Sequence, residues 1–371
     1  MARKAWPDTF GALFHSTSLT MRIFAFLMIS LSLAAAFRMN ASHSTELPSA
    51  ANGQAINIFF QSPDGGKTWQ DCSRGLPEKL EVRNVFSDNG EIFLGAENGT
   101  VYHSSDPQNG RWEVETVGGA FPEFGAYSEH ENPVMGIFQG PSGIYASIYK
   151  AGFFKRDPKT KNWEPMHLNL GENVIHAVVE TPDRTLFVSC EKGIFKSTNQ
   201  GKTWSHSYSE GWITSMVAGN GILVATGKLG LIRSEDGGER WTYAAPQKDG
   251  EAYKISFVKG LLPTVPDHFA AVCEWAPANI PVESRQVMRI SADGKNWESI
   301  DQIVPTISSM NSLTQSGNYL YCSHKNGISR SGDWGKTWQT VEAPAKLNDP
   351  FQYRLAAFGK TVYAVIVWGG C

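Results

Sequence analysis

The chain has 371 residues, of which 19% are charged and 12% are aromatic, and its formal net charge is -3. No block of basic residues occurs, which argues against a nucleic acid or an acidic membrane surface as the partner. The 36 glycines and the many aromatic residues are typical of a sheet-rich fold with frequent tight turns. The length would hold two average domains, but large all-β domains reach several hundred residues as one unit.

The first 41 residues have the layout of a secretory signal. Arg22 precedes the apolar run Ile23–Phe37, and the segment 39–41 offers a small-residue cleavage site. A transmembrane helix needs about 20 consecutive apolar residues, so this run is short for one. We therefore expect residues 1–41 to be a signal peptide region with Met21 as the true start. An uncleaved membrane anchor is the alternative.

Export is the expected consequence, to the periplasm or to the outside of a bacterial cell, with no membrane attachment after cleavage. Residues 42–55 are then a linker, and residues 56–371 form the folded domain. No Cys stands directly after the apolar run, which argues against a lipoprotein.

Motifs of common catalytic and metal sites are missing from the sequence. It contains no G-x-S-x-G and no H-E-x-x-H, and its five cysteines are widely spaced. Cys190, Cys273 and Cys322 recur at the same late position of an expected strand, which indicates buried apolar fillers. Cys371 is the one candidate for intermolecular pairing. We expect no metal, no cofactor and a monomer.

One eight-residue motif, S-x-D-x-G-x-T-W, recurs along the chain, as in 62–69 and 331–338. The copy at 197–204 has Asn for Asp, the copy at 234–241 has Arg for Thr, and three others are irregular. The Asp or Asn and the Trp of the seven copies are Asp64 and Trp69, Asp106 and Trp112, Asp157 and Trp163, Asn199 and Trp204, Asp236 and Trp241, Asp293 and Trp297, and Asp333 and Trp338.

The chemistry of this motif is that of a turn. The carboxylate can accept backbone N–H groups across a tight turn, and the glycine tolerates positive φ. The Trp then starts the next strand and packs its ring on a neighbouring sheet. We therefore expect these residues to be structural, because local backbone bonding already accounts for them.

Each motif copy lies in a unit of about 40 residues that reads as four strands. Leu186–Cys190, a Gly turn and Ile194–Ser197 precede one copy, for example, and Val174–Val179 precedes them. Six such units run from about 82 to 341, and the two chain ends, 353–368 and 56–72, would supply a seventh. The sequence predicts an all-β fold: a single seven-bladed β-propeller of four-stranded antiparallel blades, closed by pairing of the N- and C-terminal strands.

The motif resembles the Asp-box, or BNR, repeat of the sialidase-like superfamily of β-propellers. Seven copies over about 310 residues cover nearly the whole expected domain. The expected blade count and the form of the motif are most similar to those of the exported seven-bladed propellers that resemble photosystem II assembly factors. The resemblance implies a propeller fold, but this fold serves several functions.

The chain departs from the enzymes of that superfamily. Sialidases have six blades and an Arg-Ile-Pro motif, whereas the nearest string here is 289–291, with Ser for Pro. The paired propellers of the xyloglucan-cleaving glucanases need a longer chain. The 14 arginines are scattered, which argues against the arginine patch of the assembly factors.

Ligands of such propellers usually bind on the face opposite the box turns, which carries the loops that link the blades. Long loops are expected at 118–133 and 275–285. The aromatic and basic residues that we predict to bind a ligand there are Phe121, Phe124, Tyr127, Trp212, Trp275, Arg285 and Trp368. The alternative is that these side chains only cover the core.

A complete propeller without a recognisable catalytic set predicts a non-enzymatic module for binding or assembly, with a protein or a carbohydrate on the loop face. The alternative function is a divergent glycoside hydrolase of the exo-sialidase-like type, which would need two facing carboxylates. No motif singles out a catalytic pair, so the catalytic residues stay unknown.

Overall fold

The computed structural model describes residues 57–118, 132–227, 230–243, 253–264, 268–277, 285–299, 310–348 and 351–368. Within these ranges the regular elements are all β-strands, apart from one short 3-10 helix at Pro107–Asn109. The expected signal region 1–41, with Met21, and the linker 42–55 lie outside the described residues. In the described part, no helix has the length and apolar character needed to cross a membrane.

The described strands form seven four-stranded antiparallel sheets. Six of them use consecutive strands. The first three are β3 (Val82–Asp88), β4 (Glu91–Ala96), β5 (Thr100–Asp106) and β6 (Arg111–Thr116); β7 (Val134–Gly140), β8 (Gly143–Ile148), β9 (Gly152–Arg156) and β10 (Trp163–Pro165); and β11 (Ile175–Glu180), β12 (Leu186–Cys190), β13 (Gly193–Ser197) and β14 (Ser205–Tyr208).

The next three consecutive sheets are β15 (Ile213–Gly219), β16 (Ile222–Gly227), β17 (Gly230–Ser234) and β18 (Thr242–Tyr243); β19 (Tyr253–Thr264), β20 (His268–Pro277), β21 (Arg285–Ser291) and β22 (Glu298–Ser299); and β23 (Met310–Ser316), β24 (Tyr319–His324), β25 (Gly327–Ser331) and β26 (Gln339–Val341). The seventh sheet, here called the terminal sheet, joins both ends of the chain in the order β27 (Phe351–Phe358), β28 (Thr361–Trp368), β1 (Phe59–Ser62) and β2 (Gln70–Asp71).

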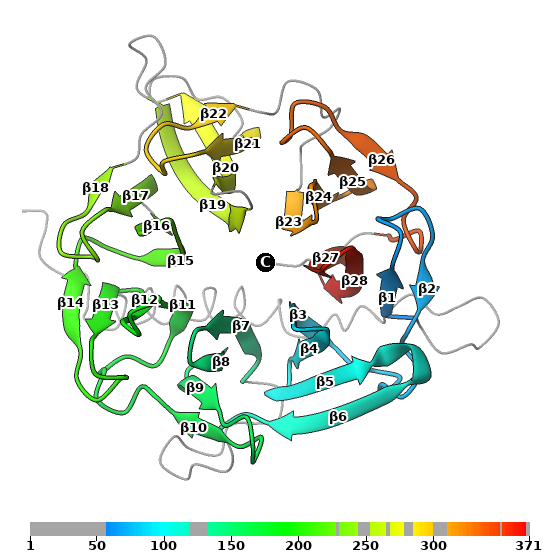
Figure 1. Cartoon of the computed structure of the whole chain (residues 1–371), viewed down its shortest axis with the longest axis horizontal. Coiled ribbons are helices and arrows are strands. Elements are labelled where there is room, and N and C mark those ends of the chain that lie inside the picture. The colour runs from blue at the N-terminus through cyan, green and yellow to red at the C-terminus, as the bar shows by residue number, and fades with distance from the viewer. Residues whose placement is uncertain are drawn as a thin grey trace, which may run out of the picture. The chain divides into compact units, whose positions relative to one another are not determined.

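The first strands of the sheets lie around a common centre (Figure 1). They contact one another in the order β3, β7, β11, β15, β19, β23 and β27, and β27 contacts β3. This is a β-propeller arrangement, and the all-β prediction is confirmed.

Burial follows the position of a strand in its sheet. The second and third strands are sandwiched between neighbouring sheets, so β12 and β17 are buried at every residue. The fourth strands form the rim, and β2 and β18 are exposed at every residue. Apolar runs such as Leu-Phe-Val in β12 are therefore required, because both faces of that strand are covered.

The core consists of apolar clusters between adjacent sheets. Phe59 of β1, for example, stacks on Tyr363 of β28 at 5.9 Å between ring centroids. The same ring meets Trp112 of β6 edge-on at 5.3 Å. A box Trp thus packs on the preceding sheet, where burial of an aromatic ring and its edge-to-face geometry both stabilise the fold.

The terminal sheet pairs the two chain ends directly. Phe59 to Ser62 of β1 pair antiparallel with Val365 to Val362 of β28. Its innermost pair also differs from the other six. In those six, the register between the first two strands shifts near the start of the first strand, whereas β27 and β28 pair without interruption from Phe351–Trp368 to Phe358–Thr361.

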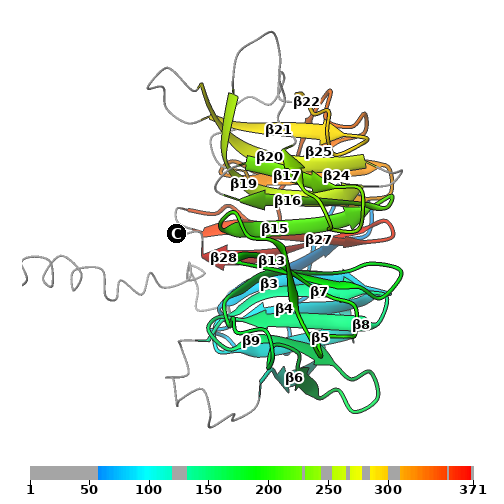
Figure 2. The ribbon, with the colours of Figure 1, turned by 90° about the vertical axis from the view of Figure 1, so that its left-hand side faces the viewer.

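The strands run between two faces of the propeller (Figure 2). Successive hairpins of an antiparallel sheet turn at alternate ends. We call the face with the turns between third and fourth strands the box face. The opposite face, with the turns between second and third strands and the links between sheets, is the loop face.

Candidate functional site

The motif residues form the turns of the box face. Asp64 Oδ1 accepts the backbone N–H groups of Lys67 and Thr68 at 3.0 Å each, and Oδ2 accepts the Thr68 hydroxyl at 2.7 Å. Hydrogen bonds from Thr68, first of all, hold the pKa of the Asp64 carboxyl well below its usual range. A carboxylate that is already bonded four times, counting Ser62, is poorly suited to proton transfer.

The other copies vary this turn. Asn199 accepts the Thr203 N–H at 2.9 Å through Oδ1 and donates to the Thr203 hydroxyl at 2.8 Å through Nδ2. Asp106 differs, because its carboxylate accepts the Asn109 side-chain amide at 2.9 Å. Backbone N–H groups are also accepted by the remaining carboxylates, Asp157, Asp236, Asp293 and Asp333.

The predicted loop-face residues fall into three groups. Phe121, Phe124 and Tyr127 lie outside the described residues. Trp275 and Arg285 were expected in a long loop, but they lie in β20 and β21 and pair with each other across the sheet, so the expected loop is shorter and its ends are strands. Trp212 and Trp368 are exposed, at 45% and 47% of their surfaces.

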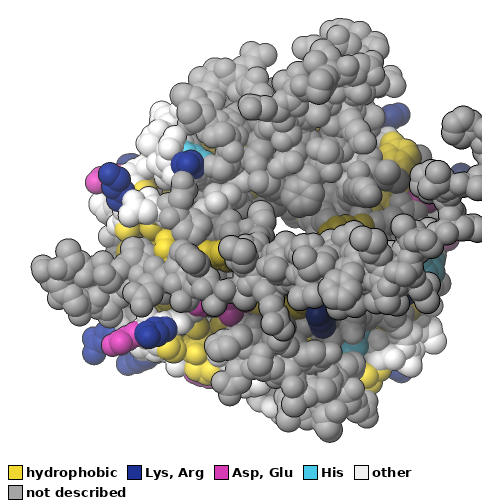
Figure 3. All heavy atoms as spheres, turned by 180° about the vertical axis from the view of Figure 1, so that it is seen from behind, with side chains coloured by type: hydrophobic (Ala, Val, Ile, Leu, Met, Phe, Trp, Pro, Cys, Tyr) yellow, Lys and Arg dark blue, Asp and Glu magenta, His cyan; other side chains and the backbone are white. Residues whose placement is uncertain are grey.

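Trp212 and Trp368 do not belong to one site. Trp212 precedes β15, and its indole Nε1 donates to His176 Nε2 at 2.7 Å. Trp368 ends β28, in a sheet that is not adjacent to the β15–β18 sheet. Figure 3 shows the loop face, where hydrophobic side chains of described residues reach the surface in several places.

A pocket of ≈ 550 Å³ lies on the loop face beside Trp368, between the β23–β26 sheet and the terminal sheet. We call it the loop-face pocket. Ala343, Ala345 and Leu347 and the partly buried Phe351 pack on the adjacent core cluster and form the apolar part of its wall. Its polar lining residues are His324, Lys325, Asn326, Lys346, Asn348 and Gln352. No Asp or Glu lines the described part of this pocket.

Two polar side chains of the loop-face pocket have fixed structural roles. His324 accepts the Asn326 N–H at 3.2 Å through Nδ1, and its Nε2 lies 2.8 Å from the Ser329 hydroxyl. Burial lowers its imidazole pKa, which favours the neutral ring. The Tyr353 hydroxyl donates to Ala345 O at 2.6 Å, and burial raises its pKa to about 12. The pocket is therefore rigid at its base, and its charges are the two lysines.

The uninterrupted pairing of β27 with β28 determines where this pocket lies. A bulge bends a strand and ends the regular pairing at a rim. Because β27 and β28 pair without a bulge, the Phe351–Trp368 pair continues the ladder to the loop face. Phe351 thereby lines the pocket, with Trp368 as its partner across the sheet.

A buried charged cluster was not predicted from the sequence. Glu115 of β6 accepts Arg156 Nη2 at 2.6 Å and Arg156 Nε at 2.9 Å, and Trp163 Nε1 at 2.9 Å. Its Oε1 also lies 2.8 Å from His103 Nε2, and His103 Nδ1 lies 2.6 Å from Glu91. Glu115, His103 and Arg156 are all buried. The spacing in sequence, 103, 115 and 156, gives no local signal of this contact.

Electrostatics of the cluster favour its ionised form. Burial opposes the charge on Glu115, but hydrogen bonds from His103 and Arg156 prevail and lower its carboxyl pKa to about 2. Burial likewise opposes protonation of His103, and Glu115 and Glu91 outweigh it, so the imidazole pKa is raised. In the described part, each carboxyl group with a clear shift has a lowered pKa, and no group of acids, histidines and cysteines could hold a metal ion.

Solved structures show which proteins share this fold. YCF48 bound to a D1 peptide is similar at 14% identity and a TM-score of 0.52, over 86% of this chain and 99% of YCF48. YCF48 from Cyanidioschyzon merolae is similar at 13% identity and a TM-score of 0.50, over 83% and 98%. An extracellular domain from B. thetaiotaomicron, BT4673, is similar at 14% identity and a TM-score of 0.54, over 78% of this chain.

At these identities the similarity shows the fold alone, a β-propeller. This chain spans 41% of the length of the B. thetaiotaomicron domain. No family model matches the sequence, and no curated protein is similar to it.

Proposed function

We propose that this chain is an exported, non-enzymatic propeller that binds a protein partner on its loop face. The observation that carries the proposal is the loop-face pocket, which combines apolar residues with polar side chains that include two lysines, and contains no carboxylate among its described lining residues. Hydrolysis of a glycosidic bond needs a pair of carboxylic acids. An apolar wall with a polar rim is instead the usual anatomy of a protein interface.

The architecture that we propose is a seven-bladed propeller of Asp-box blades, closed by its two chain ends. Seven four-stranded sheets, the pairing of β1 with β28 and the hydrogen bonds of the box carboxylates support it. Closure matters for a binding module because it removes free sheet edges that would recruit other chains.

Known relatives of the fold are consistent with such a module. One similar structure is YCF48 bound to a peptide, and another is an extracellular domain of a bacterial protein. Binding of a polypeptide and a location outside the cytoplasm are properties of those proteins. For this chain they support the proposal together with the apolar run before residue 38.

The test removes Phe351, which lines the pocket, together with Trp368, its exposed partner across the sheet. F351A/W368A should lose a specific partner that the full chain retains from an envelope extract, measured by quantitative mass spectrometry. The matched control is F358A, because Phe358 lies at the other end of β27 and is similarly exposed, at 42%. A partner kept by F351A/W368A and lost by F358A would refute the loop face as the binding surface.

Enzyme activity is tested in parallel. The full chain should show no turnover of aryl glycosides or of sialyl and xyloglucan substrates. Turnover that a single loop-face carboxylate substitution abolishes would replace the binding proposal with the glycoside hydrolase alternative.

A further inference from the structure

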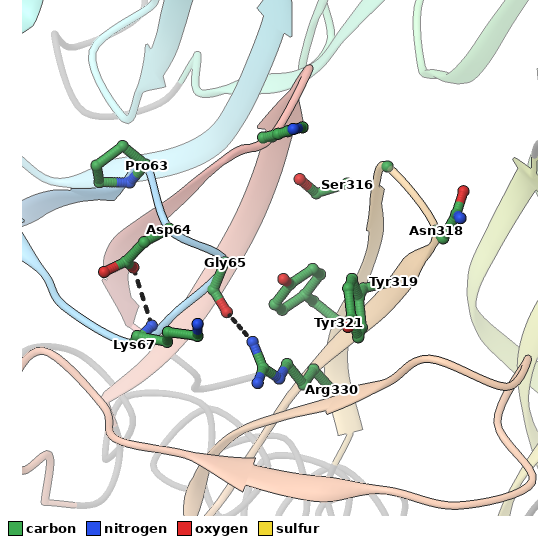
Figure 4. A pocket seen from close by; sticks show the side chains of 11 residues that line it. Pro63, Asp64, Gly65, Lys67, Ser316, Asn318, Tyr319, Tyr321 and Arg330 are labelled. Carbon is green, nitrogen blue, oxygen red and sulfur yellow. Dashed lines mark hydrogen bonds between the residues drawn. The ribbon is translucent and has the colours of Figure 1, made fainter.

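A second pocket lies on the box face, between the β23–β26 sheet and the terminal sheet (Figure 4). We call it the box-face pocket. Its volume, ≈ 610 Å³, lies in the range of small-molecule sites, roughly 300–1,000 Å³. Hairpins 316–319 and 358–361 and the box turn 62–69 surround it, so its walls come from segments far apart in the sequence.

Three cations line the box-face pocket: Lys67, Arg330 and Lys360. None of them makes an ion pair within the described part of the chain, where other basic residues in β-strands do, such as Arg233 with Glu235 and Lys196 with Glu239. Arg330 Nη1 donates to the Gly65 carbonyl at 2.7 Å, but its Nε is buried without a hydrogen-bond partner. The pocket therefore holds positive charge that the fold itself does not neutralise.

One carboxylate, Asp64, also lines the pocket, but the box turn uses it. It accepts hydrogen bonds from Ser62, Thr68 and the Lys67 backbone, as described above. Its single charge faces three cations. The balance favours an anionic ligand.

Aromatic and polar groups complete the lining. Arg330 Cζ lies 5.2 Å from the centroid of the Tyr319 ring, a cation–π contact that holds the guanidinium in place. Tyr319 is nevertheless 43% exposed, so part of its ring is free for a ligand. Ser316 and Asn318 add a hydroxyl and an amide at the same opening.

The backbone around the pocket limits the kind of ligand that it can bind. The pocket is framed by tight hairpins and a box turn, and it presents no free strand edge to which a peptide could add. Recognition must then come from side chains: cations, a tyrosine face, a hydroxyl and an amide. This combination suits a ring that carries a carboxylate and several hydroxyls.

We propose that the box-face pocket binds an acidic sugar, a uronic acid residue of a glycan, with its carboxylate at Arg330 and Lys360 and its ring on Tyr319. This site is separate from the loop-face pocket, and it stands whether or not the loop face binds a protein.

Gly65 keeps the pocket open. A Cβ atom there would lie 2.9 Å from the Tyr321 hydroxyl and 3.4 Å from Arg330 Nη1, and Gly65 also has a positive φ of 74°. G65A would therefore crowd the arginine that we expect to hold the carboxylate.

The test is calorimetric titration of the full chain with trigalacturonate, with the neutral galactose trisaccharide as the control ligand. Trigalacturonate should bind and the neutral trimer should not. R330Q should weaken binding about tenfold or more, because a charge-assisted hydrogen bond is lost. The matched control is R233Q, since Arg233 also directly precedes a box serine but forms an ion pair with Glu235. It should bind like the unmodified chain.

Two further variants guard against misfolding of R330Q. K360Q, at an exposed hairpin, should weaken binding severalfold, and F351A/W368A should leave it unchanged. The proposal is overturned if the unmodified chain does not bind at millimolar concentrations, or if the neutral trimer binds equally well. It is also overturned if an aspartate-rich peptide binds more tightly, if folded R330Q and K360Q bind normally, or if only the loop-face variant loses binding.

Discussion

We call the boundary between two neighbouring sheets a seam. Two seams use corresponding strand positions, but one is charged and filled, whereas the other contains an open pocket. At the charged seam, between the β3–β6 and β7–β10 sheets, Glu115 pairs in register with Val101 and contacts His103 and Arg156. At the open seam, between the β23–β26 and terminal sheets, the position in register with Ile328 is Val341.

The remaining positions correspond in the same way. His103 and Arg330 each directly precede a box serine, and each contacts an aromatic ring on its own sheet, Phe93 or Tyr319. Trp163 donates to the Glu115 carboxylate at the charged seam, whereas Trp69 donates to a backbone oxygen, that of Glu342, at 2.6 Å at the open seam.

The comparison indicates that the presence of one carboxylate determines whether the basic side chains of a seam are neutralised. With Glu115, the basic side chains are neutralised and the seam is filled. With Val341, Arg330 has no carboxylate partner in the described part of the chain, and a cationic pocket remains. The repeat therefore supplies the scaffold, and a substitution at a single rim-strand position either closes a seam or leaves a site.

The largest expected effect comes from breaking the charged seam. E115Q leaves the buried Arg156 without its ion-pair partner and His103 with Glu91 as its nearest carboxylate, and the loss of one partner of a buried ionic cluster costs about 3–5 kcal/mol. Urea denaturation at neutral pH should show this loss in the free energy of unfolding. E113Q is the matched control, because Glu113 is on the same strand but exposed. An E115Q variant as stable as E113Q would show that the seam is not held by its charges.

A smaller effect is expected from pH, with opposite signs for the two titrating groups. The pKa of Glu115 is lowered from 4.5 to about 2, so its stabilising contribution is present above pH 4.5 and is lost as the pH falls toward 2. The pKa of His103 is raised above 6.5, so its contribution is complete below pH 6.5 and is lost as the pH rises through the folded-state value.

The charged seam should therefore be most stable between pH 4.5 and 6.5. H103Q should lower the free energy of unfolding more at about pH 5.5 than at alkaline pH, because the contribution of the protonated imidazole is lost as the pH rises through its raised folded-state pKa. H206Q is a control, because His206 is on the exposed strand β14. An H103Q effect that does not change with pH would mean that His103 acts through packing alone.

The sequence was sufficient for the fold class because its information is local. Each box turn is made by residues within eight positions, and Asp64 with Thr68 is an example. Repetition of one local solution at a regular period predicts sheets around a centre, and the all-β propeller arrangement agrees. Trp275 and Arg285 were misplaced because strand ends depend on pairing across the sheet, which local pattern does not determine.

The sites could not be predicted in the same way because they lie between sheets. Arg330 reaches Gly65 across 265 positions of sequence, and Glu115 reaches Arg156 across 41. One signal was nevertheless present: a basic residue directly precedes the box serine in four copies, namely His103, Lys196, Arg233 and Arg330. Whether each of these has an acid within reach depends on a neighbouring sheet, and that decides between a sealed seam and a pocket.

The smallest expected change in stability comes from closing the open seam with a single charge. Gln339 of β26 pairs in register with Arg330, as Glu113 does with His103, and it is exposed. Q339E therefore offers Arg330 an internal carboxylate without disturbing the core. An exposed substitution of this kind should change the free energy of unfolding by less than about 0.5 kcal/mol.

Binding should respond much more than stability. In Q339E the new carboxylate competes with the ligand for Arg330, so trigalacturonate should bind severalfold more weakly, and the loss should shrink in high salt as the internal pair is screened. Q315E is the control, because Gln315 belongs to β23 of the same sheet and does not line the pocket. If Q339E and Q315E weaken binding equally, the effect is one of net charge, and a carboxylate opposite Arg330 does not compete with the ligand. If only Q339E does so, a carboxylate in register with Arg330 is enough to occupy the arginine that holds the ligand.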